Sequence, residues 1–479
     1  MSKEAHLMWD DSVLTIAPSS PELEKFLTYR EKSLIQDPKN PWKKVTKVTV
    51  NPLYKVISQQ NGYNVIQTMQ GLWLKVKTYL EENGWDVKFY DMRIAFPKAR
   101  LDLMCGFRFK QEELLTTFLN TNCSGLLGAP TRYGKTTLIK NTLRAFPNVH
   151  TVVTAPGADL VKQLYEDVKE ALPHREVKLI GAGSTKDPCD DINVVSMDSL
   201  HKCDASACKL LLIDEPHACV TDSRLPELTK FDKARRIGFG ATLKGRFDQR
   251  DILIEALIGP VIAERTFQEA VTEGAVCPLV VYMIVVPLSG QQDDRDRAYK
   301  AHLFKGERVA KAVRWICHEL LPQDWQTLLF IKNEEQAEYY LDWVGQDGTI
   351  AMAKRMTKKE REELMERMRG DEIKRCLASE IYAQGVTFNH VRALINLSGG
   401  GANTSTIQKP GRLAEVRPNK KCGVVFDFLF TPGSGRGSGN QALYRESLAR
   451  VKAYTEKGYE IIYVDSYNEL ENSFKEKAI

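Results

Sequence analysis

The sequence lacks several features that would assign the protein to a specialised class. No apolar run reaches the roughly 18 residues of a membrane span, and the first residues lead into no apolar core of signal-peptide length. The ten cysteines form no Cys-x-x-Cys pair, so neither a disulfide framework nor a zinc site is indicated. We therefore expect a cytoplasmic protein with reduced thiols and no membrane partner.

The composition favours an ordinary globular protein of several domains. Hydrophobic residues make up 43% of the 479 residues and charged residues 27%, which excludes extensive disorder, and the length predicts roughly three domains. Basic residues are concentrated near the N-terminus, where positions 39–110 hold 13 Lys and Arg against 5 Asp and Glu. This segment is a candidate for contact with a polyanion such as nucleic acid.

The first 104 residues predict a small α+β accessory domain. Val13–Ile16 has the composition of a strand, and Ser20 before Pro21 is a helix-start signal. A second helix is indicated by the apolar spacing within Leu72–Leu80, and Trp85–Phe89 alternates as a strand does.

The rest of the chain alternates short apolar runs with helical patterns, which indicates parallel sheets flanked by helices. The predicted fold class is α/β, with two tandem RecA-like parallel-sheet domains at 105–274 and 275–479 after the accessory domain. A helix is expected at Phe267–Glu273, another from the capping box of Thr357 and Glu360 to Gly370, and a flexible loop at Pro432–Gly439. Strands are expected at 124–127, 151–154, 193–196, 210–213 and 236–239, and then at 279–286, 327–331, 375–378, 393–396, 422–426 and 460–464.

A phosphate-binding loop is predicted between the first of these strands and the helix after it. Counted from Ala129, the spacing to Gly134-Lys135-Thr136 matches the Walker A pattern, with alanine where the first glycine commonly stands. Loop residues that include Thr131, Gly134 and Thr137 would bind ATP, Lys135 would reach the β and γ oxygens, and Thr136 would ligate Mg²⁺. The competing interpretation is a chance Gly-Lys-Thr turn.

An apolar strand at 210–213 ends in two adjacent carboxylates. Asp214 is predicted to hold Mg²⁺ with the Walker A threonine, and Glu215 to polarise the water that attacks the γ-phosphate. An isolated Asp-Glu pair is usually a solvated strand end, but the phosphate-binding loop upstream favours the catalytic interpretation.

With Asp-Glu-x-His at 214–217, the chain resembles superfamily 2 helicases. That resemblance implies an ATP hydrolase in which Phe109 and Gln111 bind adenine, and in which His217 and Thr242 couple nucleotide state to domain closure. It also implies that Pro156, Gln163 and Ser379 contact nucleic acid, that Gly385 contacts the nucleotide, and that Gln408 and Arg412 act in catalysis, Arg412 as an arginine finger.

Four residues depart from the family pattern. Glu415 stands where motif VI usually has a second arginine, with Arg417 two residues further on as a possible substitute. Thr387 replaces the usual motif V aspartate, and Arg132-Tyr133 occupies a part of the Walker A loop where small residues are usual.

The accessory domain and compact organisation resemble bacteriophage recombination helicases of the UvsW type. This resemblance implies a motor, located in the host cytoplasm if viral, that unwinds forks and branch-migrates Holliday junctions in replication, recombination or repair. A monomer is favoured, with recombination or replication proteins as possible partners. Tryptophans interleaved with Lys43, Lys44 and Lys47 favour DNA binding by the N-terminal segment, although Trp73 and Trp85 are expected in its core.

Two other functions remain open from the sequence. One is an RNA helicase, or the motor subunit of a restriction or defence complex whose nuclease lies in another chain. The other is an ATP-gated clamp that binds branched DNA and hydrolyses ATP poorly because Glu415 replaces an arginine, although Glu215 and Arg412 argue against it.

Overall fold

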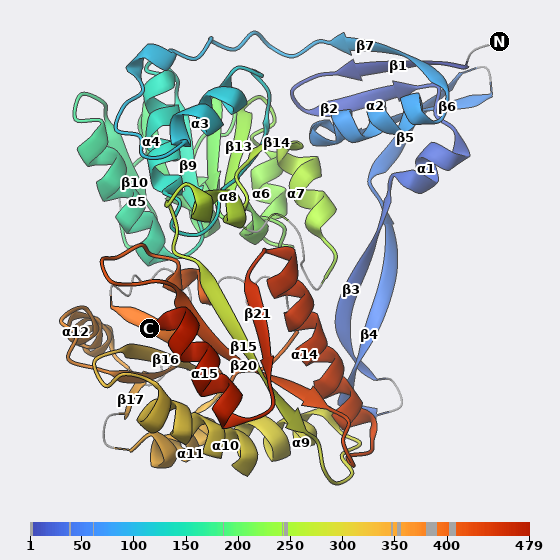
Figure 1. The fold of residues 1–479 in the computed structure, drawn as a ribbon. Helices are drawn as coiled ribbons and strands as arrows, with labels where there is room; N and C mark the ends of the chain where they lie inside the picture. Colours follow the sequence, from blue (N-terminus) through green and yellow to red (C-terminus); the bar gives the residue numbers. More distant parts are fainter. Residues whose placement is uncertain are drawn as a thin grey trace. The chain divides into compact units, whose positions relative to one another are not determined.

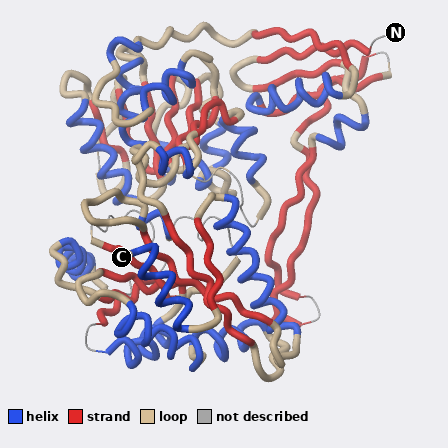
Figure 2. The backbone as a smooth tube through the Cα atoms, viewed as in Figure 1, coloured by secondary structure: helices blue, strands red, loops and turns tan. Residues whose placement is uncertain are grey.

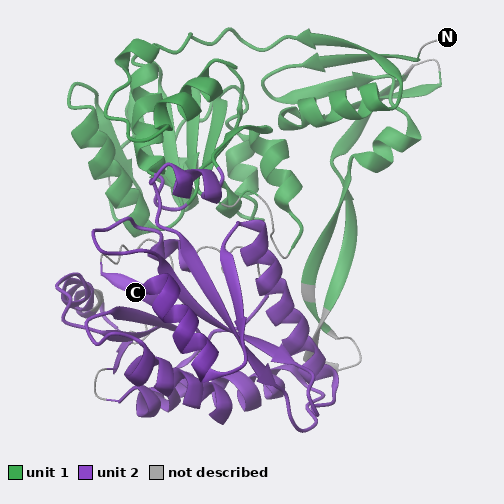
Figure 3. Cartoon of the chain, viewed as in Figure 1, with its two compact units in different colours: residues 1–130, 134–265 green, residues 131–133, 266–479 purple. Residues whose placement is uncertain are grey.

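The computed structural model describes residues 3–37, 40–60, 62–184, 186–241, 243, 248–345, 348–351, 356–379, 390–401 and 409–479. The chain divides into two compact units, one of residues 1–130 and 134–265 and one of residues 131–133 and 266–479 (Figure 3). In the described part of the chain, every helix is too short or too polar to cross a membrane.

The first unit begins with a five-stranded sheet in the order β5-β6-β2-β1-β7. Ser20 caps the first helix through its side chain, as predicted, and α2 follows β6 after a short 3-10 turn, η1 (Gln70–Leu72). Trp73 is half-buried, and its ring stacks on that of Trp9 at a centroid distance of 4.7 Å, so it packs against the core. The elements are β1 Lys3–Trp9, β2 Val13–Ala17, α1 Pro21–Phe26, β5 Tyr54–Gln60, β6 Tyr63–Met69, α2 Trp73–Glu82 and β7 Trp85–Asp91.

A long β-hairpin, which the sequence patterns did not predict, leaves this small domain. Strands β3 (Thr28–Asp37) and β4 (Asn40–Pro52) pair antiparallel as a separate two-stranded sheet, and they form the long strand pair in Figure 2. An ion pair between Glu31 and Arg250 anchors its base, beside a hydrogen bond of 3.1 Å from the Lys32 amide to the Asp248 carbonyl. Among the described side chains farther out, those of Ile35, Gln36 and residues 46–50 are exposed.

The small domain packs on helix α7 (Asp251–Ile258) of the first parallel-sheet domain. The Gln70 side chain donates a hydrogen bond of 3.2 Å to the Ile258 carbonyl. Gly71 lies so close to α7 that a Cβ there would stand 2.0 Å from the Glu255 carbonyl oxygen, so only glycine permits this contact. Ala256 joins the small domain's own hydrophobic core.

The first parallel sheet has seven strands in the order β10-β11-β9-β12-β13-β8-β14 (Figure 1). Its five inner strands are those predicted, and each is buried along its whole length. The two outermost strands were not predicted. The strands are β8 Gly125–Gly128, β9 Thr151–Ala155, β10 Val177–Ile180, β11 Ile192–Ser196, β12 Leu210–Asp214, β13 Arg235–Gly240 and β14 Val261–Glu264, and the other helices are α3 Gln111–Leu119, α4 Lys135–Ala145, α5 Ala158–Ala171 and α6 Leu225–Thr229.

The second unit holds another seven-stranded parallel sheet, in the order β17-β18-β16-β19-β20-β15-β21. Six of these strands were predicted and β17 was not. The capping box of Thr357 and Glu360 is present. The loop expected at Pro432–Gly439 ends at Gly437, since α14 begins at Ser438. The elements are α8 Phe267–Thr272, β15 Leu279–Pro287, α9 Arg295–Tyr299, α10 Glu307–Trp315, β16 Gln326–Ile331, α11 Glu334–Val344, β17 Gly348–Ala351, α12 Lys358–Arg369, β18 Arg375–Ser379, β19 Val391–Asn396, β20 Gly423–Thr431, α14 Ser438–Glu456, β21 Glu460–Val464 and α15 Tyr467–Ala478.

Candidate nucleotide site and nucleic-acid interface

The predicted phosphate-binding loop connects strand β8 to helix α4. Gly134 is the N-cap of α4 with φ +95°, a left-handed conformation that favours glycine, and no side chain of the described residues caps the helix. The first backbone amides of α4 are therefore available to an anion. Lys135 is the first helical residue, Thr136 and Thr137 follow in the first turn, and all three side chains are half-buried.

Gln111 lies directly against this loop. A Cβ on Gly134 would stand 2.5 Å from the Gln111 side-chain nitrogen, so the loop and the glutamine are in contact. The Gln111 Oε1 also accepts a hydrogen bond of 2.9 Å from the Arg108 amide, which fixes the amide group. Phe109 has φ +55° and its side chain is 48% exposed, so an apolar surface is open to solvent beside Gln111.

Asp214 ends β12 and Glu215 follows it, two strands from β8 in the same sheet. Asp214 pairs in register with Phe239, and Phe239 pairs with Leu127, so Asp214 is level with the end of β8. At about 5 Å between neighbouring strands, the lateral separation is about 10 Å. Glu215 has φ +54°, a left-handed conformation rare for glutamate that turns the chain sharply at the sheet edge.

Lys135, Glu215 and His217 form one charged cluster. The Lys135 ammonium lies 3.3 Å from one Glu215 carboxylate oxygen, and the His217 Nδ1 lies 3.3 Å from the other. Burial favours the neutral form of Glu215, but Lys135 and His217 outweigh it and lower its pKa. Burial, reinforced by Glu215, raises the pKa of the Asp214 carboxyl to about 7. The same cations therefore favour the charged form of Glu215, whereas at Asp214 burial and the neighbouring Glu215 charge outweigh them.

Asp214 has the properties of a magnesium ligand. Its Oδ1 is buried and has no hydrogen-bond partner among the described residues, which is costly unless a cation or a donor satisfies it. Thr136 offers a hydroxyl in the first turn of α4, and Mg²⁺ binds through one or two such oxygens plus phosphate oxygens. The residues present therefore fit Mg²⁺ bound with a nucleotide.

Gly240 ends β13 and lies against the turn that carries the carboxylates. A Cβ at Gly240 would stand 3.0 Å from the Pro216 Cδ and 2.9 Å from the Leu243 side chain. The turn that carries Glu215 and His217 therefore packs directly on the end of β13. Thr242 lies outside the described residues.

The predicted nucleic-acid contacts of the first unit lie at accessible positions. Pro156 is half-buried at the end of β9, next to Gly157 with φ +80°, and Gln163 is exposed on α5. In the hairpin, Lys43, Lys44 and Lys47 all belong to β4, and the Lys47 side chain is exposed.

The second unit carries the remaining predicted residues. Ser379 ends β18, and its buried hydroxyl has no hydrogen-bond partner within the described part of the chain. Arg412 is half-buried in a short 3-10 turn, η9 (Pro410–Leu413). Arg417, the possible substitute arginine, forms an ion pair of 3.2 Å with Glu415. Gly385, Thr387 and Gln408 lie outside the described residues, and Thr131 is grouped with this unit.

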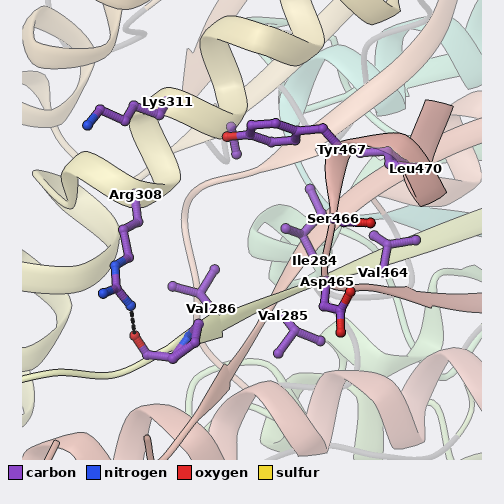
Figure 4. Close-up of a pocket in the computed structure, with 12 residues that line it drawn as sticks. Ile284, Val285, Val286, Arg308, Lys311, Val464, Asp465, Ser466, Tyr467 and Leu470 are labelled. Carbon is purple, nitrogen blue, oxygen red and sulfur yellow. Dashed lines mark hydrogen bonds between the residues drawn. The ribbon is translucent and has the colours of Figure 1, made fainter. Parts of the chain in front are cut away.

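A cavity of about 440 Å³ in the second unit was not predicted. It opens where β15 and β21 end, and Figure 4 shows Arg308 and Lys311 of α10 on one side and Tyr467 of α15 on the other. Arg308 donates a hydrogen bond of 2.8 Å to the Pro287 carbonyl. Tyr467 stacks on Trp315 at a centroid distance of 4.6 Å, so both walls are fixed by neighbouring contacts.

Two family models match the chain in tandem. The model described as the res subunit of type III restriction enzymes matches residues 104–245, and the helicase conserved C-terminal domain matches residues 311–416. A viral relative, "Putative helicase 22" of Sulfolobus islandicus filamentous virus (isolate Iceland/Hveragerdi), is 20% identical over 426 residues, which cover 78% of this chain and 72% of the relative.

Three solved structures align with the chain at low sequence identity, and the two with TM-scores above 0.5 share its fold. The DNA-bound ATP-dependent Type ISP restriction-modification enzyme LlaBIII aligns with 84% of this chain and 35% of its own at 13% identity, with a TM-score of 0.56. S. cerevisiae Dbp5 bound to RNA and ADP BeF3 aligns with 84% of this chain and 96% of its own at 14% identity, with a TM-score of 0.51. T4 UvsW aligns with 97% of this chain and 99% of its own at 15% identity, with a TM-score of 0.42.

Proposed function

We propose that this chain, a superfamily 2 helicase by its tandem family matches and its paired RecA-like fold, hydrolyses ATP to unwind or branch-migrate forked and junction DNA. The observation that carries the ATPase is the cluster of Lys135, Glu215 and His217 at one sheet edge, beside an Asp214 oxygen that no described residue satisfies. This cluster contains the groups that the transfer of a phosphoryl group to water requires.

Each group has a separate role in the proposed reaction. The amides at the start of α4 and the Lys135 ammonium bind the β- and γ-phosphates, and Gln111 together with Phe109 binds adenine. Asp214 and Thr136 would hold Mg²⁺, which supplies charge neutralisation on the phosphate oxygens when bound. Glu215 orients the attacking water and accepts its proton, a role that requires an ionised carboxylate beside the γ-phosphate.

Arg412 and His217 complete the proposed cycle. The family resemblance assigns Arg412 to the γ-phosphate, where a guanidinium stabilises the charge of the transition state. His217 contacts Glu215 on one side, and its turn packs on Gly240 through Pro216. A change at the γ-phosphate can therefore reach the end of β13, which leads to Thr242, the predicted coupling residue.

The proposed DNA contacts combine the parallel-sheet domains with the hairpin. Pro156, Gln163 and Ser379 would hold one strand through its phosphates. The lysines of β4, on a ribbon held at its base by Glu31 and Arg250, would grip the duplex arms of a fork or junction. This placement supports a branched-DNA substrate because the hairpin belongs to the small N-terminal domain, separate from both parallel sheets.

Steady-state ATPase with different nucleic acids tests the proposal. Wild type and Glu215→Gln would be compared without nucleic acid, with single-stranded DNA, forked DNA, a four-way junction and matched RNA. Stimulation by forked or junction DNA well above that by single strands, lost in Glu215→Gln, is the expected result. Stimulation by RNA alone would overturn it in favour of RNA remodelling, and tight junction binding without turnover in the wild type would establish an ATP-gated clamp.

A second candidate, the motor of a restriction complex, is favoured by one observation. The N-terminal family match is to the res subunit of type III restriction enzymes. Such a motor would translocate on unbranched duplex DNA, so stimulation by long linear duplexes, equal to that by junctions, would favour it.

A further inference from the structure

A chain of buried hydrogen bonds runs through the second unit and ends at the turn that carries Arg412. The Lys409 ammonium donates a hydrogen bond of 2.6 Å to the Ser398 hydroxyl, and Ser398 donates one of 3.0 Å to the side-chain carbonyl of Asn396. The Asn396 amide donates one of 3.0 Å to the Asp427 carboxylate. All donors point in the same direction, so each bond polarises the next.

Asp427 is the acceptor at the end of this chain and is itself fully engaged. The Arg450 guanidinium donates to both of its oxygens at 2.8 and 3.0 Å, and the Tyr454 hydroxyl and the Phe428 amide donate to it at 2.8 and 2.7 Å. Arg450 is 1% exposed and Asp427 is fully buried. Burial disfavours the charge of Arg450, but Asp427 outweighs it and raises the pKa of the guanidinium.

The same arginine holds the turn after β19. Arg450 donates a hydrogen bond of 2.6 Å to the Gly400 carbonyl, and the Gly400 amide donates one of 2.8 Å to the Tyr299 hydroxyl. Gly399 and Gly400 both have positive φ, and a Cβ on Gly399 would stand 2.2 Å from the Tyr299 ring. The turn that presents Ser398 to Lys409 therefore has a conformation fixed by α9 and α14.

Lys409 occupies an unusual position for a lysine. It is 2% exposed, its ammonium lies 5.7 Å from the centre of the Phe330 ring, and it is the N-cap of η9. The Arg412 amide donates a hydrogen bond of 3.2 Å to the Lys409 carbonyl. Burying an ammonium is costly unless the surrounding groups compensate it, so the side chain anchors η9 from inside the domain.

We propose that Lys409 is a positioning residue for ATP hydrolysis, and that the chain Lys409–Ser398–Asn396–Asp427 sets the orientation of η9 and hence of the Arg412 guanidinium. This inference rests on the proposed role of Arg412. A displacement of about 1 Å of a transition-state group costs up to about 100-fold in rate, so a small shift of η9 is sufficient. Ground-state nucleotide binding by the first unit does not depend on it.

The test compares Lys409→Met, Ser398→Ala, Arg412→Ala and the double variant Lys409→Met with Arg412→Ala. Under the DNA condition that stimulates the wild type most, Lys409→Met is expected to lower kcat about 10- to 100-fold and to change KM for ATP less than about twofold. Ser398→Ala leaves the Lys409 charge in place, so it is expected to lower kcat by a smaller factor, again with little change in KM for ATP. The double variant is expected to be no slower than Arg412→Ala alone.

A matched control is Gln326→Leu, which also removes a buried hydrogen bond in the second unit, 2.8 Å from Gln326 to the Met368 carbonyl. Its melting temperature should fall as much as that of Ser398→Ala while kcat stays at the wild-type value. If Lys409→Met and Ser398→Ala keep wild-type kcat, or if Lys409→Met and Arg412→Ala lower kcat multiplicatively, the inference is overturned. Wild-type kcat in Arg412→Ala would instead overturn the proposed role of that arginine.

Discussion

The two units each contain a cluster of charged side chains, and the two clusters are built in opposite ways. In the first unit, Lys135 and Glu215 are 12% and 22% exposed, and the Asp214 Oδ1 has no hydrogen-bond partner in the described structure. In the second unit, Asp427 and Arg450 are almost completely buried, and both Asp427 oxygens accept several hydrogen bonds. The first cluster has capacity for another partner, and the second is saturated.

This difference distinguishes a site that can bind a ligand from a network that fixes the position of the backbone. A polar group left unsatisfied at a sheet edge costs stability, and a ligand that satisfies it recovers that cost. A saturated buried network instead restricts the backbone to one arrangement and loses much when one member is removed. Substitutions in the first cluster should therefore lower ATP turnover with little change in stability, whereas substitutions in the second should lower stability and, through the position of Arg412, also turnover.

The largest expected effect is a loss of stability caused by a substitution in the second cluster. Asp427→Ala leaves the Arg450 guanidinium buried without its counter-charge, which should lower the free energy of unfolding of this unit by about 3–5 kcal/mol. Urea unfolding followed by tryptophan fluorescence measures this. A loss below about 1 kcal/mol would mean that the network contributes little to the stability of this unit, and the difference inferred between the two clusters would be wrong.

Glu215→Gln should show the opposite profile. Removal of the proposed general base should lower ATP turnover by about 100-fold or more, while the free energy of unfolding changes by at most about 1 kcal/mol because partly exposed ion pairs contribute little. ATPase and unfolding measured on one preparation decide this. Near-normal turnover in the variant would remove Glu215 from the mechanism.

Gly240→Ala changes a packing contact next to the turn that carries Glu215 and His217, so it should affect both stability and ATPase. The added methyl group would press on Pro216 and Leu243, and overpacking of this kind typically costs about 1–3 kcal/mol. Since Pro216 lies between Glu215 and His217, stimulation of ATPase by DNA should decrease more than basal ATPase. Equal loss of both rates would indicate that the turn does not transmit nucleotide state.

The smallest effect on both measurements is expected from the hairpin, which belongs to neither cluster. Charge reversal at Lys43, Lys44 and Lys47 should weaken DNA binding and reduce the slope of log affinity against log salt by about 1 for each phosphate that the variant no longer neutralises. Basal ATPase should not change. Unchanged affinity and salt slope would exclude the hairpin as a DNA-binding element.

The sequence predicted the parts of the fold that are fully buried. Strands such as β12 and β15 are continuous apolar runs because both faces of a parallel sheet are covered. Strands β10, β14 and β17 lie at sheet edges and have only four residues each, so their apolar runs are too short to mark a strand. The hairpin was missed because Val48 and Val50 are 51% and 60% exposed, so its apolar positions mark no core.

The residues of the candidate site and of the network behind Arg412 also fall into those that the sequence predicted and those that it did not. Lys135, Asp214 and Glu215 follow predicted strands at motif spacing, so their proximity could be predicted. The network of Lys409 could not, because Asn396, Asp427 and Arg450 are far apart in sequence and none belongs to a recognisable pattern. The left-handed conformation of Glu215 is also invisible in the sequence, since glutamate rarely adopts it.

The hairpin also bears on how separate copies of the protein avoid one another. A two-stranded sheet has two outer edges whose backbone groups can pair with a strand of another molecule, and exposed valines at Val48 and Val50 would strengthen such pairing. Lysines along an edge oppose it, because two like-charged ribbons repel each other. We therefore expect Lys32 and Lys47 to oppose edge-to-edge association of two hairpins, and neutral replacements there should increase self-association of the protein in the absence of DNA.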